Sequence, residues 1–132
     1  MKNLFLSFFA AATVLSCSTM NTSKVGKAQP PIKNTSWTLA DNVKGTKPTL
    51  VIETGKVTGN GGCNNYFGTL SLDATAGNFS AKELGSTRKM CDNMAVETNF
   101  MKMLGEADKY VLNGNMLELY KGNLLLLKFN KL

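Results

Sequence analysis

Short runs of β-forming residues, separated by glycine and asparagine, are the feature that most limits what this chain can fold into. From position 36 onward, Val, Ile, Leu, Thr and aromatic residues recur in runs bounded by turn residues. Such spacing is typical of an antiparallel sheet of short strands. The pattern predicts eight strands, at Ser36–Ala40, Thr49–Glu53, Lys56–Gly59, Tyr66–Leu72, Gly77–Ala81, Tyr110–Asn113, Met116–Tyr120 and Leu124–Asn130.

Three turns between these strands are marked by residues that accept a positive φ. They are Thr54-Gly55, Asn113-Gly114-Asn115 and Lys121-Gly122-Asn123. A tight hairpin needs such residues, because its backbone twist places central turn residues in the left-handed region. The last three predicted strands are therefore expected to form a meander.

One segment with helical periodicity interrupts the strands and predicts a helix over about residues 92–104. Asp92 or Asn93 is expected to cap its start, and Gly105 is expected to end it. The helix is expected to pack on one face or one end of the sheet. Its apolar row is Val96, Phe100, Met103 and Ala107, and its polar positions include Glu97, Asn99 and Lys102.

The first 16 residues have the composition of an export signal. Lys2 supplies a positive charge, residues 4–15 are mostly apolar, and Val14-Leu15-Ser16-Cys17 closes the segment. An apolar stretch of this length is too short to span a bilayer permanently. Cleavage before Cys17, followed by acylation of its thiol and amino group, would anchor the chain stably to a membrane. The alternative is an ordinary secretory signal in which Cys17 is incidental.

The residues after the signal divide into a polar stretch and one domain. Residues 17–34 are rich in Ser, Thr, Asn and Lys and contain Pro30-Pro31, so we expect a lipidated flexible tether. Residues 35–132 are then long enough for one domain with one core. We expect this domain to be monomeric.

The absence of histidine excludes several classes of enzyme. A chain with no histidine lacks Ser-His-Asp and Cys-His catalysis and the HExxH zinc site. Its acidic residues show no spacing that would pair two of them for glycoside hydrolysis. We therefore expect no catalytic residues, no metal and no cofactor. The lysines are scattered singly along the chain, which argues against nucleic acid as a partner.

Two internal cysteines, Cys63 and Cys91, are expected to form a disulfide in an oxidising envelope. It would close a loop of about 29 residues and contribute roughly 3–4 kcal/mol in the loop-entropy account of cross-linking. A pair of buried thiols is the alternative, because some bacterial envelopes oxidise poorly.

Several segments of the chain, taken together, resemble a known family. They are NTSWTL at 34–39, GNGGCNNYFG at 59–68, STRKMC at 86–91, the helix residues Glu97 and Phe100, and NGNMLELYKGNLLLLKF at 113–129. In this order they resemble the META domain of HslJ-type heat-inducible bacterial lipoproteins, over about residues 34–132. The resemblance implies a mainly β (α+β) fold, in which a small antiparallel β-barrel-like sheet has one packed helix. It also implies a link to stress responses, and it implies no shared catalytic mechanism.

Five residues within these segments are candidates for binding. Arg88 has a planar fork suited to carboxylate or phosphate, and Ser86 and Thr87 add hydroxyl groups beside it. Asn64 and Tyr66 lie in the glycine-rich segment. Each also has a structural interpretation, in which Arg88 pairs with an acid such as Glu97, Asn64 holds a local turn, and Tyr66 joins Trp37 in the core.

We expect a lipid-anchored protein of the bacterial envelope, at the outer membrane, with a non-catalytic binding or stress-related role. One alternative is a carrier of a small apolar ligand, which predicts an internal cavity lined by Trp37, Leu50, Phe79 and Phe100. The other is a protein-binding module, such as an inhibitor of a cell-wall-degrading enzyme, which predicts contact through residues 59–68 or 86–90.

Overall fold

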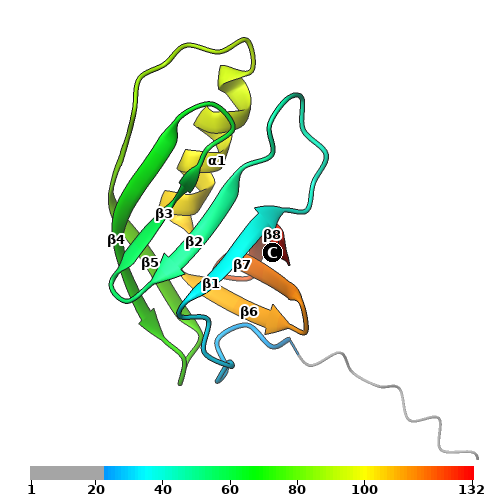
Figure 1. The fold of residues 1–132 in the computed structure, drawn as a ribbon. Helices are drawn as coiled ribbons and strands as arrows, with labels where there is room; N and C mark the ends of the chain where they lie inside the picture. The colour runs from blue at the N-terminus through cyan, green and yellow to red at the C-terminus, as the bar shows by residue number, and fades with distance from the viewer. Residues whose placement is uncertain (1–22) are drawn as a thin grey trace, which may run out of the picture.

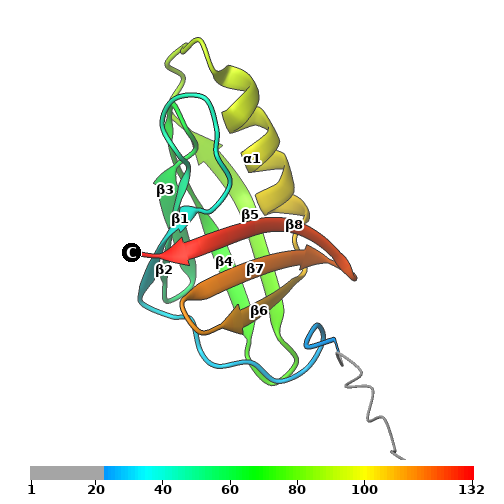
Figure 2. The same cartoon turned by 90° about the vertical axis from the view of Figure 1, so that its right-hand side faces the viewer.

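The computed structural model describes residues 23–132, so the predicted signal (1–16) and the lipidation residue Cys17 lie outside the described residues. Within 23–132 the chain forms a closed antiparallel barrel with one helix packed on it (Figures 1 and 2). The elements are β1 (Thr35–Leu39), β2 (Thr49–Glu53), β3 (Lys56–Asn60), β4 (Asn65–Asp73), β5 (Asn78–Ser86), α1 (Met94–Glu106), β6 (Lys109–Asn113), β7 (Met116–Lys121) and β8 (Leu124–Lys131).

The strands pair in chain order, and β8 closes the barrel against β1. This arrangement confirms the eight predicted strands and the meander of β6, β7 and β8. Closure also pairs the two strands that would otherwise be the edges of the sheet. The seam between β5 and β6 is short, with Asn78 opposite Lys109, because the chain leaves β5, forms α1 and then returns.

Strand β5 continues to Ser86, whereas the sequence pattern ends it at Ala81. The difference has a local cause. The register shifts between Phe67 and Thr69 of β4, and Glu83 on β5 has a φ of 52°. This bulge breaks the alternation that marks a strand in sequence, but the pairing resumes on its far side.

The barrel interior is filled by inward-facing side chains of the strands. The largest fully buried ones are Trp37, Leu50, Ile52, Val57, Phe79, Tyr110, Leu117, Leu119 and Phe129. Phe100 joins α1 to this core, because its ring lies 5.6 Å from that of Tyr66 and 6.2 Å from that of Phe129. Tilted and edge-on aromatic contacts of this kind add to the stabilisation from burial.

The helix differs from its prediction in its end, in the row that it buries and in its N-terminal cap. It continues through Gly105 to Glu106, and Ala107 ends it with an extended backbone. The row that faces the barrel contains Glu97, Phe100 and Leu104, so Glu97 is buried although its charge predicts exposure. Asn93 does occupy the N-cap position, but its side chain donates to Lys44 O at 3.0 Å instead of capping the helix.

The segment before β1, predicted as part of a flexible tether, contacts the barrel at Gln29, Pro30 and Ile32, whereas Pro31, Lys33 and Asn34 are exposed. The backbone N–H of Gln29 donates to Ala74 O at 2.8 Å, and Tyr110 Oη donates to Pro30 O at 3.0 Å. Ile32 is 1% exposed and belongs to the core cluster. One apolar residue at 32 therefore helps to hold an otherwise polar stretch against the barrel.

Replacing Ile32 with Ala is expected to lower the free energy of unfolding by about 2 kcal/mol, because it removes a buried side chain and leaves a cavity. Urea unfolding followed by circular dichroism measures this. Lys33→Ala, at the exposed neighbouring position, is the control and should have little effect. Equal unfolding midpoints for both variants would show that the segment does not contribute to the core.

Candidate functional site

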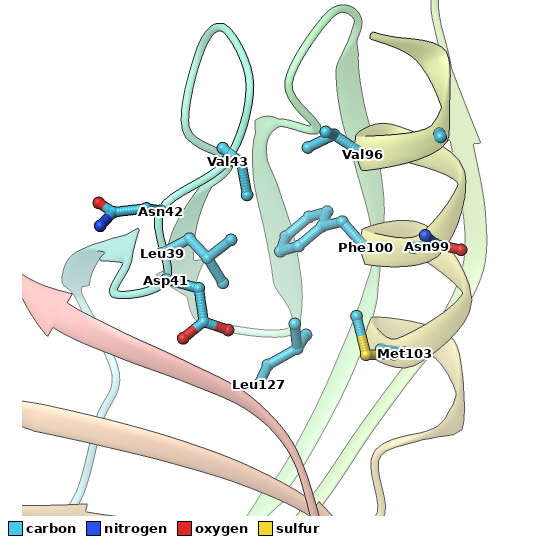
Figure 3. A pocket seen from close by; sticks show the side chains of 10 residues that line it. Leu39, Asp41, Asn42, Val43, Val96, Asn99, Phe100, Met103 and Leu127 are labelled. Carbon is cyan, nitrogen blue, oxygen red and sulfur yellow. The ribbon is translucent and has the colours of Figure 1, made fainter.

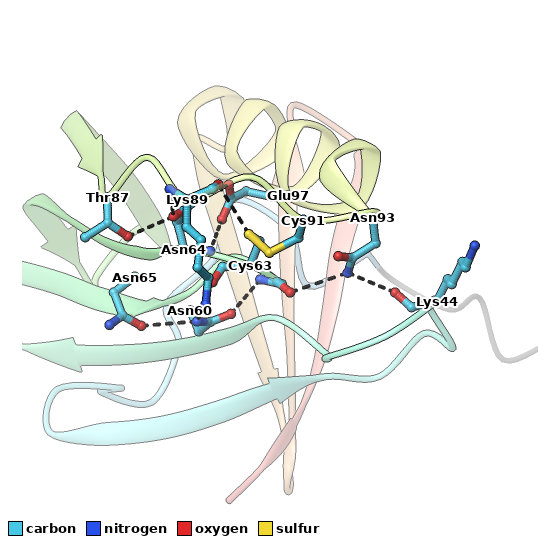
Figure 4. Close-up of a disulfide and its surroundings, with 11 residues drawn as sticks. Lys44, Asn60, Cys63, Asn64, Asn65, Thr87, Lys89, Cys91, Asn93 and Glu97 are labelled. Carbon is cyan, nitrogen blue, oxygen red and sulfur yellow. Dashed lines mark hydrogen bonds between the residues drawn. A yellow bond between two sulfur atoms is a disulfide. The ribbon is translucent and has the colours of Figure 1, made fainter.

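A disulfide joins the turn before β4 to the connection between β5 and α1. Cys63 and Cys91 are bonded, with their Cα atoms 6.0 Å apart, which confirms the pairing expected from sequence (Figure 4). This separation lies within the ordinary range for disulfides. The bond fixes one end of the segment 86–91, which passes over the turn.

Asn64 is the centre of a buried polar cluster beneath this segment, and it is 2% exposed. Its side-chain amide donates to Lys89 O at 2.9 Å and to Glu97 Oε2 at 2.8 Å. Its side-chain oxygen accepts from Thr87 Oγ1 at 2.9 Å and from the Lys89 N–H at 2.7 Å. Both amide hydrogens and both lone pairs of this side chain are thus used (Figure 4).

Glu97 anchors the helix to the same turn. Its Oε1 accepts the backbone N–H of Asn64 at 2.6 Å, so both carboxylate oxygens are bonded to one residue. The turn comes this close because position 61 is glycine. A Cβ there would lie 2.9 Å from Glu97 Cγ. The Gly-Gly-Cys-Asn segment therefore forms a corner to which the helix and the 86–91 segment are attached.

The five predicted binding residues do not share one exposed surface. Asn64 and Tyr66 are buried, and Tyr66 Oη donates to Thr49 O at 2.6 Å, while burial raises the pKa of its phenol above the ordinary range. Thr87 uses its hydroxyl on Asn64. Ser86 and Arg88 are exposed.

The pairing of Arg88 with Glu97, one of the structural alternatives for Arg88, is not formed, because both carboxylate oxygens of Glu97 accept from Asn64. Within residues 23–132, Arg88 has neither a side-chain hydrogen bond nor an ion pair. The neighbouring Met90 is also exposed, at 82% of its surface. After the end of β5, residues 87–90 thus form an exposed connection, which Asn64 holds at Thr87 and Lys89 and the disulfide holds at Cys91.

A separate pocket of about 310 Å³ lies between α1 and the β1–β2 loop (Figure 3). Its apolar side chains point toward one another across the gap from β1, the loop, the helix and β8. The lining residues are Leu39, Asp41, Asn42, Val43, Ala95, Val96, Asn99, Phe100, Met103 and Leu127.

This pocket lies outside the barrel, whereas the sequence predicts a cavity inside it. Trp37, Leu50 and Phe79 are packed in the core, so Phe100 is the one residue of that predicted cavity that lines the pocket. Sequence reasoning missed Val43. The sequence does contain a signal for this residue, because Val43 is the one large apolar residue between Ala40 and Lys47.

The polar residues of the pocket lie on its exposed parts. Asp41, Asn42 and Asn99 are exposed, while Leu39 and Phe100 are buried. Asp41 forms no ion pair within the described part of the chain. In residues 23–132 no three His, Cys, Asp or Glu side chains gather as they would around a metal ion. Over the same residues, no helix is long and apolar enough to cross a bilayer.

Comparison with known proteins supports the fold. A family model described as "META domain" matches residues 30–131. A solved structure described as "NMR structure of the protein from Burkholderia xenovorans" is 24% identical with a TM-score of 0.64, and the match covers 76% of this chain and 83% of that chain. A second, described as "NMR structure of the protein", is 22% identical with a TM-score of 0.58, covering 74% and 89%. No curated protein matches the sequence.

Proposed function

Because this chain belongs to the META domain family, we propose that it is a lipid-anchored, non-catalytic protein of the bacterial envelope that binds a small apolar group between α1 and the β1–β2 loop. We place it at the outer membrane as a monomer with a stress-related accessory role. The apolar leader that ends at Cys17 supports the anchor. The pocket shown in Figure 3 supports the binding role.

The pocket is the observation on which the binding role rests. Its floor is formed by Leu39, Phe100 and Leu127, and Val43 and Met103 are partly buried beside it. A volume of about 310 Å³ is at the lower end of the range for small-molecule sites. It has room for one ring or a short alkyl group, which would gain by leaving water.

The buried polar groups support a role without catalysis. Asn64 and Glu97 are the buried polar side chains among residues 23–132, and they are bonded to each other. A general acid or base needs a proton position open to a substrate. Glu97 instead has each oxygen occupied by a donor from Asn64.

A titration of the ¹⁵N-labelled domain (residues 18–132) with n-hexanol tests the pocket. Amide chemical shifts monitor the binding. We expect saturable shifts at Val43, Val96 and Met103, whereas ethanol at equal concentration should leave them nearly unchanged. Val43→Asp should weaken hexanol binding about tenfold, because it exchanges an apolar wall for a charge. The matched control is Lys44→Asp, which introduces the same side chain at the adjacent position, outside the pocket lining. Shifts that spread evenly over the barrel, or equal affinities for the two variants, would contradict the pocket as the binding site.

The anchor has its own test. In bacteria producing the full chain, Cys17→Ala is expected to move the protein from the membrane pellet to the soluble fraction, or to leave an unprocessed precursor. The reason is that the variant lacks the thiol that acylation requires. Normal processing and membrane retention of that variant would contradict lipidation at Cys17.

A second candidate function is protein binding through residues 86–90. The observation that favours it is the exposure of Arg88 and Met90 on a segment that Asn64 holds at Thr87 and Lys89 and the disulfide holds at Cys91. A segment that is already held in place loses little entropy when it binds. If the chain inhibits a muramidase, Arg88→Ala with Met90→Ala should abolish inhibition at unchanged melting temperature. Inhibition that survives both changes would exclude the loop.

A further inference from the structure

The tip of the β7–β8 hairpin exposes two large apolar side chains next to each other. Leu124 is 64% exposed and Leu125 is 43% exposed. Lys121 at the end of β7 is also exposed, and Gly122 makes the turn with a φ of 57°. We name Lys121, Leu124 and Leu125 the leucine tip.

A bulge keeps Leu125 outside the core. Leu127 and Phe129 point inward, so strict alternation would also turn Leu125 inward. The register shifts at this point, because Leu119 lies opposite Leu127 whereas Tyr120 lies opposite Leu125. The extra residue between these pairs reverses the alternation, as a bulge does. Leu125 therefore stays available for contact, and so does Leu124, which is 64% exposed at the start of β8.

The leucine tip lies beside the place where the described chain begins. Ser23, Lys24 and Val25 line one surface hollow together with Tyr120 of β7 and Asn123 of the turn. Figure 2 shows the first described residues on the same side of the molecule as the end of β7 and the start of β8. The N-terminal segment and the hairpin thus share one face.

Chain length brings this face close to the proposed anchor. Six residue steps separate Cys17 from Ser23, and a fully extended chain of that length spans at most about 22 Å. A membrane that holds Cys17 therefore lies within that distance of Ser23, whatever path the intervening residues take. The face with the leucine tip is the one that this short connection brings nearest.

The charge of this face suits anionic lipid. Lys24, Lys27 and Lys121 are exposed. Two nearby acids, Glu118 and Asp108, accept hydrogen bonds from Tyr120 Oη and the Gly122 N–H and keep their negative charges, which the three lysines exceed by one. Lysines near a membrane surface are attracted to anionic headgroups, and adjacent apolar side chains add hydrophobic insertion.

We propose that the leucine tip inserts into the interfacial region of an anionic membrane next to the lipid anchor. The inference rests on the proposed anchoring at Cys17 and adds the orientation of the domain. The insertion holds the hairpin against the lipid. It leaves the loop 86–90 at the other end of the molecule, away from the first described residues (Figures 1 and 2).

The test uses ¹⁵N-labelled residues 17–132 with the Cys63–Cys91 disulfide intact, which leaves Cys17 as the free thiol. Cys17 is coupled to a maleimide lipid in nanodiscs of phosphatidylglycerol and phosphatidylcholine that contain a gadolinium-chelating lipid. The residues next to Cys17 are broadened by the coupling itself; among the turns of the barrel, we expect the amides of Gly122–Leu126 to be broadened most, and the turns at Gly55 and Gly114 much less. Leu124→Ser with Leu125→Ser should reduce the broadening at the tip about tenfold.

Leu132→Ser is the matched control, because Leu132 is 70% exposed and lies at the opposite end of β8 from the tip. It should leave the pattern unchanged. Broadening that is uniform, or strongest at another turn, overturns the inference. The inference is also overturned if, without lipid, the amide shifts of the tip change with protein concentration. That result would assign the leucines to contact with a second copy of the chain. The mass of the native protein, extracted from bacterial membranes, shows in a separate measurement whether Cys17 is acylated. A failure of the proposed anchoring is therefore distinguishable from a failure of the proposed insertion.

Discussion

The Asn64→Asp variant is expected to lose about 4 kcal/mol of unfolding free energy at neutral pH, although the two side chains have the same shape. The change removes the amide that donates to Lys89 O and to Glu97 Oε2. It also places a second carboxylate against Glu97 in a buried site. Each buried acceptor left without its donor costs about 1–3 kcal/mol, and the repulsion adds to this cost.

The effect of Asn64→Asp should depend on pH in a defined direction. Repulsion from the Glu97 carboxylate raises the folded-state pKa of the introduced carboxyl group above its unfolded value. The penalty is therefore present at neutral pH and shrinks as the pH falls through the raised folded-state pKa. Urea unfolding at pH 7 and pH 5 measures both free energies. Asn65→Asp, at the exposed neighbouring position, is the control and should cost little at either pH.

A double variant tests whether the Asn64–Glu97 contact itself is responsible. Adding Glu97→Gln to Asn64→Asp restores one donor and one acceptor between the two side chains. Part of the lost stability should return, so the two changes should be non-additive. Strictly additive losses would show that Asn64 acts through its other partners, Lys89 and Thr87.

Loss of the disulfide is expected to lower the free energy of unfolding by about 3–4 kcal/mol, because the unfolded chain gains the freedom of a loop of about 29 residues. Cys63→Ala with Cys91→Ala should still fold, since Asn64 continues to bind Lys89 and Glu97. The segment 86–91 should become more mobile, because one of its attachments is gone.

Urea unfolding with and without a reductant measures the contribution of the disulfide. In reductant, the protein without substitutions should have the same urea midpoint as the double alanine variant. The reductant should not change the midpoint of that variant. Faster hydrogen exchange should be confined to residues 86–93. Identical midpoints for the oxidised protein and the double variant would contradict a stabilising disulfide.

Much of the fold was predictable because its signals are local. The eight strands follow from alternation and from turns such as Gly55, Gly114 and Gly122, each of which has a positive φ. The helix was also predicted, but its end was not. Gly105 is a common helix terminator, yet the packing of Leu104 and Ala107 in the core keeps the helix going past it.

The candidate sites were less predictable, because they depend on which distant segments meet. Glu97 has the charge of a surface residue, but the turn at Asn64, 33 residues away, supplies two donors that allow its burial. The pocket requires the β1–β2 loop with Val43 to lie opposite α1. Neither relation is visible in a periodic pattern, which reports only neighbours along the chain.

By itself the sequence determined the strands, the turns, the helix and the pairing of Cys63 with Cys91, because each follows from spacing or from residue type. Tertiary structure decided the burial of Glu97 and Ile32, the position of the pocket and the exposure of Leu125. The physical reason is that burial and exposure depend on the whole packed surroundings of a side chain, and those surroundings form only when the barrel closes.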